Sequence, residues 1–386
     1  MKAHVCLVSA QAAANLLPAL DPALKPAKAV LVVTGKMQAQ ANHLEAVLKE
    51  NGIKVAQLRL ENEHNFHRIQ NELIELAAKL ESDEVSLNMT GGTKLMSVAA
   101  QSVADVGGWR MFYVDADTDQ AIWLDKTTDT PAHPLHEQLK LRHYLRSYGF
   151  SLSEKPRHPH VRPEQQDLLR TLSTQIGSLQ DALGTLNYLA QIAENEGRLS
   201  VQLDKWQLDS RSLEALLRHF EDANSLKLQG DTLRFTSEAD RDFVKGGWLE
   251  LHAMQALQQI SGELGIRDKS IGLEVMDEAS GTKNELDVAF MTRNRLFVVE
   301  CKTARIDKPA GNARNPAPPK ANDTLFKLAE NCRRIGGLGT RGMLLSYRDL
   351  NTPELRLAHA LNIAVVSGGE IASLPEKLKN WITPKH

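Results

Sequence analysis

Short apolar runs alternate with segments of helical periodicity along the first 125 residues. The apolar runs, which we expect to be strands, cover residues 4–9, 29–34, 53–60, 84–88 and 110–115. Between them, apolar residues recur at the three- to four-residue spacing of a helix at residues 38–50, 65–80 and 94–106. Strands separated by helices predict βαβ units and a mainly parallel sheet. Residues 1–145 are therefore predicted to form a Rossmann-like, doubly wound domain, with a further strand at residues 121–124.

The middle of the chain is predicted to be mainly helical. Residues 151–163 hold three prolines and few apolar residues, which indicates a linker. A helix is expected at residues 212–220, followed by short strands at 225–228 and 232–236 around the turn residues Gly230 and Asp231. A helix followed by a hairpin is the outline of a winged helix. We expect residues 160–245 to form a helical, winged-helix-like connector.

The last third of the chain has a different element order. A helix is predicted at residues 248–260, then strands at 271–276, 286–291 and 296–302. A helix at 324–335, a strand at 342–346, a further helix and a strand at 363–367 follow. This α-β-β-β-α-β order predicts a third, α/β domain over residues 246–386.

Composition excludes several classes of protein. The 386 residues carry a formal net charge of −2, so a nucleic-acid site must be a local patch. The cysteines Cys6, Cys301 and Cys332 form no CxxC pair, which fits a reducing cytosol and argues against a disulfide framework. Polar residues interrupt the N-terminal apolar stretch, so no signal peptide is predicted. Because no apolar run is long enough for a membrane span, we expect a cytoplasmic protein.

The strands predicted at residues 286–291 and 296–302 carry charged residues that are candidates for catalysis. If Arg293 and Asn294 form the centre of the turn between them, Asp287 lies directly opposite Glu300. Lys302 then shares the face of Glu300, because side chains alternate with a period of two. The opposite face is wholly apolar and suits a core. Asp287, Glu300 and Lys302 are therefore the candidate catalytic residues.

Two directly opposed carboxylates destabilise a hairpin unless something offsets their repulsion. A divalent cation would do so, and hard oxygen ligands select Mg²⁺ or Mn²⁺. Glu250, in the helix that opens the domain, is a third candidate ligand beside Asp287 and Glu300. The alternatives are a solvated helical glutamate for Glu250 and an ordinary salt bridge to Glu300 for Lys302.

These residues carry a resemblance to a known superfamily. The pattern D-x(12)-E-x-K on a hairpin, within this element order, resembles the PD-(D/E)xK restriction-endonuclease-like nucleases. Leu286 stands where that motif has its proline, a position that the superfamily often relaxes. The resemblance implies a metal-dependent phosphodiester hydrolase acting on DNA or RNA.

A loop rich in Pro, Gly and Asn follows Lys302 and is basic. It and the following segment carry Arg305, Lys308, Arg314, Lys320, Lys327, Arg333, Arg334 and Arg341. Basic side chains supply most nucleic-acid affinity, so the loop is a candidate phosphate-contacting arm. A solvated loop is the alternative.

A second group of candidate functional residues, with ligand-binding chemistry, lies in the first domain. The strand at residues 84–88 runs into Thr90-Gly91-Gly92-Thr93-Lys94 and then a helix, where backbone N–H groups and Lys94 would attract an anion. The sequence matches neither a Walker loop nor a dinucleotide fingerprint. Ser9, Thr34 and Lys36 follow other strands, at the edge where doubly wound sheets bind ligands. Turn chemistry alone is the alternative for the two glycines.

The segment MTGGTKLMSVAA resembles the signature of CARF domains, the CRISPR-associated Rossmann-fold sensors. A CARF domain followed by a PD-(D/E)xK domain is the layout of the CRISPR ancillary nucleases. The resemblance implies that a cyclic oligoadenylate binds a homodimer across its two-fold axis and activates the nuclease. It also implies that residues 90–94 hold this effector, and it favours cleavage of single-stranded nucleic acid and nicking of duplex DNA.

Two other functions stay open at this point. One is a ligand-responsive DNA-binding regulator that uses the winged-helix-like middle and has an inactive C-terminal domain. The other is a nuclease that needs no effector, whose first domain serves only dimerisation or DNA docking. The sequence does not decide between DNA and RNA, between Mg²⁺ and Mn²⁺, or between effector ring sizes.

Overall fold

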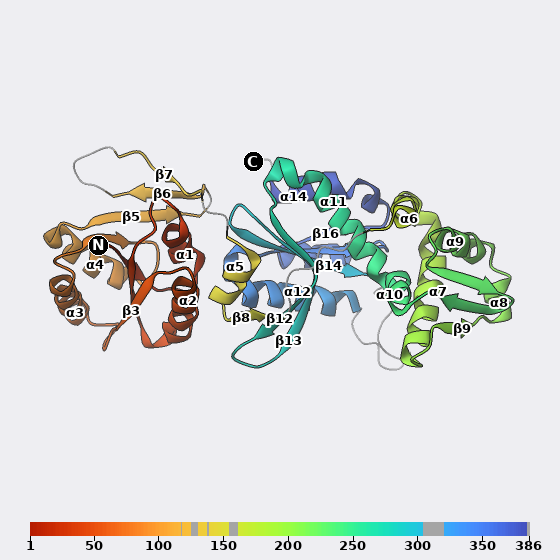
Figure 1. Cartoon of the computed structure of the whole chain (residues 1–386), viewed down its shortest axis with the longest axis horizontal. Helices are drawn as coiled ribbons and strands as arrows, with labels where there is room; N and C mark the ends of the chain where they lie inside the picture. The colour runs from red at the N-terminus through yellow and green to blue at the C-terminus, as the bar shows by residue number, and fades with distance from the viewer. Residues whose placement is uncertain (117, 125–129, 137–138, 154–160, 304–319, 384–386) are drawn as a thin grey trace.

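Three regions lie in a row in the computed structural model of the chain, and their order in space differs from their order in sequence (Figure 1). The structure describes residues 1–386 except 117, 125–129, 137–138, 154–160, 304–319 and 384–386. The N-terminal sheet domain lies at one end and the helical connector at the other. The C-terminal sheet domain lies between them, so it contacts both.

The N-terminal domain is the predicted doubly wound sheet. Its strand order is β3-β2-β1-β4-β5-β6-β7, in which β1 to β5 are parallel and β6 and β7 are antiparallel. The strands are β1 (Lys2–Leu7), β2 (Lys28–Val33), β3 (Lys54–Arg59), β4 (Glu84–Asn88), β5 (Arg110–Asp115), β6 (Gln120–Trp123) and β7 (His133–Pro134). The helices are α1 (Ala13–Leu20), η1 (Gly35–Met37), α2 (Gln38–Glu50), α3 (Phe66–Lys79) and α4 (Lys94–Gly107).

The strand order reverses at β1 and β4, and doubly wound sheets form a crevice beyond the carboxyl ends of such strands. A buried amide network shapes that crevice. The side chain of Asn88 donates to Asn15 Oδ1 at 2.9 Å, and its Oδ1 accepts from the Thr90 hydroxyl at 2.7 Å. The Val114 N–H donates to Thr90 Oγ1 at 2.7 Å. The loop after β4 is thereby tied to both β5 and α1.

The connector holds the predicted helix and hairpin. Its helices are α6 (Pro163–Thr174), α7 (Ile176–Asn195), α8 (Lys205–Leu208), α9 (Arg211–Asp222) and α10 (Glu238–Asp242). The strands β9 (Ser200–Gln202), β10 (Leu226–Gln229) and β11 (Thr232–Phe235) form a small antiparallel sheet in the order β10-β11-β9. The winged-helix outline is therefore present, with β9 as an additional strand.

The C-terminal domain is built on a six-stranded sheet of order β16-β15-β14-β13-β12-β8. Its strands are β12 (Asp268–Asp277), β13 (Lys283–Thr292), β14 (Arg295–Lys302), β15 (Arg341–Ser346) and β16 (Ile363–Ser367). Its helical elements are η2 (Phe243–Gly247), α11 (Trp248–Leu264), α12 (Lys320–Gly336), η3 (Gly337–Gly339), α13 (Thr352–Ala360), η4 (Gly368–Ser373) and α14 (Leu374–Ile382). The predicted α-β-β-β-α-β order is confirmed, with α14 added at its end.

The linker prediction for residues 151–163 was wrong at its start. Strand β8 (Phe150–Leu152) pairs antiparallel with β12 and forms an edge of the C-terminal sheet. The helix before it, α5 (Leu141–Ser147), was not predicted at all. Both are short, and their apolar residues are buried by contacts with distant parts of the chain, so local periodicity gives little signal. Residues 154–160 of the predicted linker lie outside the described structure.

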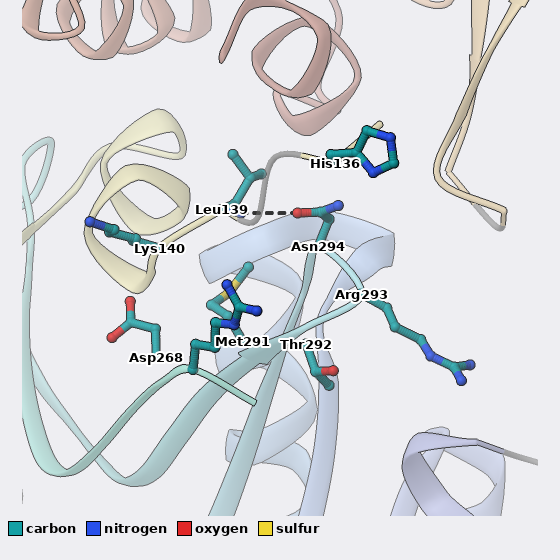
Figure 2. A pocket seen from close by; sticks show the side chains of 9 residues that line it. His136, Leu139, Lys140, Asp268, Met291, Thr292, Arg293 and Asn294 are labelled. Carbon is teal, nitrogen blue, oxygen red and sulfur yellow. Dashed lines mark hydrogen bonds between the residues drawn. The ribbon is translucent and has the colours of Figure 1, made fainter. Parts of the chain in front are cut away.

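The N-terminal and C-terminal domains share one buried apolar cluster. Leu139, Leu141 and Tyr144 belong to the same cluster as Met291 and Leu296 of the β13–β14 hairpin. The Tyr144 hydroxyl donates to the Gly336 carbonyl at 3.2 Å, and the N–H of Leu139 donates to Asn294 Oδ1 at 3.0 Å. Figure 2 shows this second contact, in which the turn of the hairpin meets the segment that leads into α5.

Among the residues that the structure describes, no helix combines the length and the apolar character that crossing a membrane requires.

We predict that Gly91→Ala destabilises the N-terminal domain. A Cβ atom at Gly91 would lie 2.0 Å from the Leu7 carbonyl oxygen, a backbone atom that cannot move without shifting β1. Overpacking of this kind costs about 1–3 kcal/mol. Thermal unfolding should show a lower transition temperature for Gly91→Ala. Gly177→Ala in α7 is the control, because a Cβ there meets no atom within 4 Å. Equal transition temperatures for Gly91→Ala and the wild type would contradict the close approach.

Candidate active site and sensor site

The β13–β14 hairpin has the predicted register. Val288 pairs with Val299 and Thr292 with Arg295, so the turn is centred on Arg293 and Asn294. Both turn residues have positive φ, 48° and 54°, as a two-residue hairpin turn of the primed type requires. Extending the pairing by one residue places Asp287 opposite Glu300. The apolar face is buried as predicted, with Phe290 stacked on Phe297 at a ring distance of 5.1 Å.

The candidate catalytic residues lie together. Lys302 Nζ lies 2.5 Å from Glu300 Oε1, and both side chains are largely buried. Asp287 Oδ2 accepts a hydrogen bond of 2.7 Å from the N–H of Cys301, between Glu300 and Lys302. The ion pair expected as the alternative for Lys302 is therefore present. It does not exclude catalysis, because it holds the ammonium group beside the two carboxylates.

Glu250 belongs to the same group of charges. It lies in the first turn of α11, directly after the π-helical turn η2. The pKa of Glu250 is raised from 4.5 to about 8, first by burial and then by the charges of Asp287 and Glu285. A solvated glutamate would not feel these groups, so the structure does not support the solvated alternative for Glu250.

Burial and the neighbouring Glu300 charge raise the pKa of Asp287 as well. Burial alone would lower the pKa of Lys302, but the Glu300 and Asp287 carboxylates raise it above its ordinary value. Lys302 is thus held as a cation among several acids. Carboxyl groups therefore outnumber positively charged side chains at this place.

The sequence prediction missed Glu285 and the contribution of the connector. Glu285 lies two residues before Asp287, and so on the same face of β13, and alternation alone identifies it. Together with Glu250 and Lys302 it lines a cleft of ≈590 Å³. Asn187 and Gln191 of α7 line the opposite wall. These two residues lie more than 90 positions from β13 in sequence, and no local signal connects them to the site.

The connector also fixes the end of β14. The Asn187 side chain donates to the Thr303 carbonyl at 2.8 Å, and the Thr303 hydroxyl donates to the Lys245 carbonyl at 3.2 Å. A Cβ at Gly246 would lie 2.3 Å from Thr303 Oγ1, so the glycine permits this close approach. Lys302 is therefore positioned by the connector and η2 as well as by the sheet.

The basic arm predicted after Lys302 is only partly described. Arg305, Lys308, Arg314 and the side chain of Lys320 lie outside the described residues. Two of the arginines that follow are engaged in ion pairs, Arg333 with Glu330 and Arg334 with Asp277. Arg341 lines a cavity between the N-terminal and C-terminal domains. The phosphate-contacting arm thus stays a prediction.

The predicted sensor residues divide into groups. Ser9 and Thr90 line the same cavity of ≈480 Å³ as Arg341. Lys36 lines a separate pocket near β2 and β3, and its Nζ lies 3.9 Å from Glu63 Oε1. Thr34, directly after β2, is buried. Lys94 is exposed at the start of α4.

The remaining loop residues have structural roles. Gly91 and Gly92 pack against Leu7, and Gly92 has a φ of 74°, so both glycines have the structural explanation given as the alternative. Thr93 caps α4 by accepting from the N–H of Met96 at 3.2 Å. A ligand contact by these three residues is not tested by this geometry.

Comparison with known proteins identifies both sheet domains. Residues 3–144 match the family model of the Card1 CARF domain, and residues 237–384 match the model of the Card1-like endonuclease domain. A search of curated proteins finds no match.

Solved structures agree with the fold over nearly the whole chain. Protein VC1899 from Vibrio cholerae is 25% identical with a TM-score of 0.89, over 99% of this chain and 98% of that one. Can2 from Sulfobacillus thermosulfidooxidans, solved with cyclic tetra-adenylate, is 23% identical with a TM-score of 0.81, over 99% of this chain and 100% of that one.

A type III CRISPR defence DNA nuclease activated by cyclic oligoadenylate is 17% identical with a TM-score of 0.56, over 95% of this chain and 48% of that one. Because one domain model matches each end of the chain in the expected order, the protein belongs to the CRISPR ancillary nuclease family that joins a CARF domain to a Card1-like, restriction-endonuclease-like domain.

Proposed function

We propose that this protein is a metal-dependent endonuclease, activated by a cyclic oligoadenylate bound at its N-terminal domain. The observation that carries the proposal is the group formed by Glu250, Asp287, Glu300 and Lys302 at the end of the β13–β14 hairpin. Its substrates are single-stranded nucleic acid and duplex DNA that it nicks. It acts in the cytoplasm, in CRISPR defence.

The donor set fits a divalent cation. Within the described residues, no three His, Cys, Asp or Glu side chains are already arranged around one metal position. Glu250 and Asp287 nevertheless have raised pKa values, caused by burial and then by neighbouring carboxylates, and a bound cation would relieve that repulsion. Glu250, Asp287 and Glu300 would hold Mg²⁺ or Mn²⁺. Such a cation, when bound, lowers the pKa of a water molecule and offsets charge on the scissile phosphate.

The protein's own side chains supply the rest of the site. Lys302 carries a positive charge into the cleft and stabilises the negative charge that develops on the phosphate. The Cys301 N–H orients the Asp287 carboxylate, and Asn187 holds the chain directly after Lys302. The regulator alternative requires an inactive C-terminal domain. The complete set of charged residues and the match to an endonuclease domain favour the nuclease.

The sensor assignment rests on the CARF match and on the crevice at β1 and β4. Ser9, Thr34, Lys36 and the loop Thr90–Gly91–Gly92–Thr93–Lys94 are the proposed effector residues. The complex of Can2 with cyclic tetra-adenylate supports this class of ligand. The fold similarity to Can2 extends over the whole chain, which makes the same ligand class the first to test here.

A homodimer is also proposed, because a ligand with two-fold symmetry suits an isologous pair of sensors. The described surface of the N-terminal domain has an exposed apolar strip on β5 and β6 and directly after β6. Tyr113 and Ile122 are cross-strand partners and are 45% and 38% exposed, and Leu124 is 40% exposed. Clustered exposed apolar side chains favour a protein contact.

The central prediction concerns cleavage. Plasmid DNA, single-stranded DNA and single-stranded RNA should be cut only when Mn²⁺ or Mg²⁺ and a cyclic tetra- or hexa-adenylate are both present. Glu300→Ala and Lys302→Ala should each lower the rate by about 100-fold or more, since the first removes a proposed metal ligand and the second removes the positive charge that stabilises the phosphate. Glu263→Ala, at the exposed end of α11, is the control. Cleavage that needs no effector would point to the ungated enzyme, and no cleavage despite effector binding would point to the regulator.

Stability should depend on pH through Glu250. Its folded pKa of about 8 lies above the ordinary value of 4.5, so the folded state holds more protons and stability falls as pH rises between these values. Urea unfolding of metal-free protein should show Glu250→Gln losing less stability over this range, by on the order of 2 kcal/mol. Added Mn²⁺ should stabilise the wild type at high pH and should stabilise Asp287→Asn less. Glu263→Gln should behave as the wild type. A wild type that loses no more stability than Glu250→Gln as pH rises would contradict the assignment.

The dimer can be tested by sedimentation. Wild-type protein should sediment as a dimer, and Ile122→Glu should shift it towards the monomer, because a charge in a buried contact is costly. Ile74→Glu on α3 is the matched control, since Ile74 is also exposed, at 51%, but lies away from the strip. A monomeric wild type, or equal behaviour of both variants, would show that the strip is not the dimer contact.

A further inference from the structure

The cavity between the N-terminal and C-terminal domains is built by both of them. Ser9 and Thr90 line it from the sensor crevice, while Asn294, Arg295 and Arg341 line it from the C-terminal sheet. Its volume of ≈480 Å³ is in the range of small-molecule sites, about 300–1,000 Å³. A ligand at Ser9 and Thr90 therefore shares its cavity with the domain that carries the catalytic group.

The hairpin turn reaches this cavity through polar contacts from both of the residues Asn294 and Arg295. Asn294 accepts from the N–H of Leu139 at 3.0 Å, and the Arg295 guanidinium donates to the Ala116 carbonyl at 3.3 Å. Asn294 also lines a second cavity of ≈440 Å³, with Lys140 and Arg267 (Figure 2). The turn thus borders two cavities.

The polar groups of the first cavity are not fully used within the described structure. Asp119 has a φ of 51°, an uncommon value for a residue other than glycine, and its buried Oδ1 has no hydrogen-bond partner. A buried acceptor without a partner is costly, and such groups concentrate at functional sites. Burial raises the pKa of Asp119, although a hydrogen bond from the Asn294 side chain and the nearby Arg295 charge act in the opposite direction.

The side chains around the cavity complement a nucleotide. Arg295 and Arg341 offer planar guanidinium groups, which bind phosphate oxygens in pairs. Asp119 offers a buried acceptor for an amino group or a ribose hydroxyl. Tyr113, which is 45% exposed, offers a ring face on which a base can stack.

We propose that this cavity is a nucleotide-phosphate site in which Arg295 and Arg341 of the C-terminal domain contact the effector directly. The proposal rests on the proposed function, because it assigns part of the effector's binding energy to the nuclease domain. The ligand is a cyclic oligoadenylate, one part of which occupies the cavity of each protomer. A linear mononucleotide has the same chemistry and is the second source to test.

The placement of the two arginines connects this site with catalysis. Arg295 begins β14, which ends at Lys302, and Arg341 begins β15, which runs parallel beside it. Phe297 pairs with Arg341 at one end of the two strands and Lys302 pairs with Ser346 at the other. A phosphate that bridges both arginines would therefore act on the ends of two adjacent strands. If this phosphate binds one position of the turn more tightly than another, its binding would shift Glu300 and Lys302 at the other end of β14.

Binding of cyclic tetra-adenylate and of ATP to the full chain tests the proposal, measured by calorimetry. Arg341→Ala and Arg295→Ala should each raise the Kd of the ligand that binds by about tenfold or more, since each loses a charged contact. Arg341→Lys should be intermediate, because it keeps the charge and loses the planar fork. Arg356→Ala, an exposed arginine on α13, should leave the Kd unchanged. Thermal unfolding verifies that each variant is folded, and Arg341 carries the test if Arg295→Ala is not.

The outcomes separate this inference from the proposed function. If cyclic tetra-adenylate binds the wild type and the Arg341 and Arg295 variants equally, the inference is wrong and the gated nuclease stands. If only ATP binds, and binding depends on Arg341, the cavity is a nucleotide site and the cyclic effector is wrong. If neither ligand binds the wild type, the inference is wrong, and the cleavage assay with cyclic hexa-adenylate decides the proposed function separately.

Discussion

The arrangement of this protein depends on the electrostatic repulsion between carboxylates that the β13–β14 hairpin holds close together at one of its ends. Asp287 and Glu300 are brought together by a register that the turn and the apolar face fix, and Glu250 and Glu285 add further negative charge. Sheet packing supplies the free energy that keeps the group together. Lys302 offsets only part of this charge.

The other end of the same hairpin lies against the sensor. Because the C-terminal domain sits between the N-terminal domain and the connector, the crevice beyond β1 and β4 borders the C-terminal domain directly. The connector joins these two domains in sequence but does not lie between them in space. Its residues instead line the candidate active-site cleft, and the contact of Asn187 with Thr303 holds the end of β14. The connector therefore lies on the side of the C-terminal domain that carries the candidate active site.

The sequence predicts the hairpin well because its signals are local. Alternation, the turn residues Arg293 and Asn294, and the spacing of Asp287 from Glu300 determine the register without any other part of the chain. Glu285 follows from the same alternation and was overlooked. By contrast, the hydrogen bond from Leu139 to Asn294 joins residues 155 positions apart, and α5 and β8 are stabilised mainly by distant partners. Such contacts depend on how domains pack, and periodicity carries no information about that packing.

The sensor loop shows a second limit. Thr90, Gly91, Gly92, Thr93 and Lys94 were predicted as one ligand-binding unit, but the chain uses them differently. Gly91 permits contact with Leu7, Thr93 caps α4, and Thr90 joins a buried network that faces the cavity. A sequence pattern shows which residue types are present, while only packing shows which of them have groups left to offer a ligand.

Hydrogen exchange of the full chain, with and without cyclic tetra-adenylate, tests most directly whether the sensor acts on the catalytic hairpin. The arrangement described here predicts that the effector changes amide protection in the sensor crevice and also along β13, the turn at Arg293 and Asn294, and β14. Changes confined to the N-terminal domain, in a protein whose cleavage is activated by the same ligand, would contradict a direct route through the hairpin.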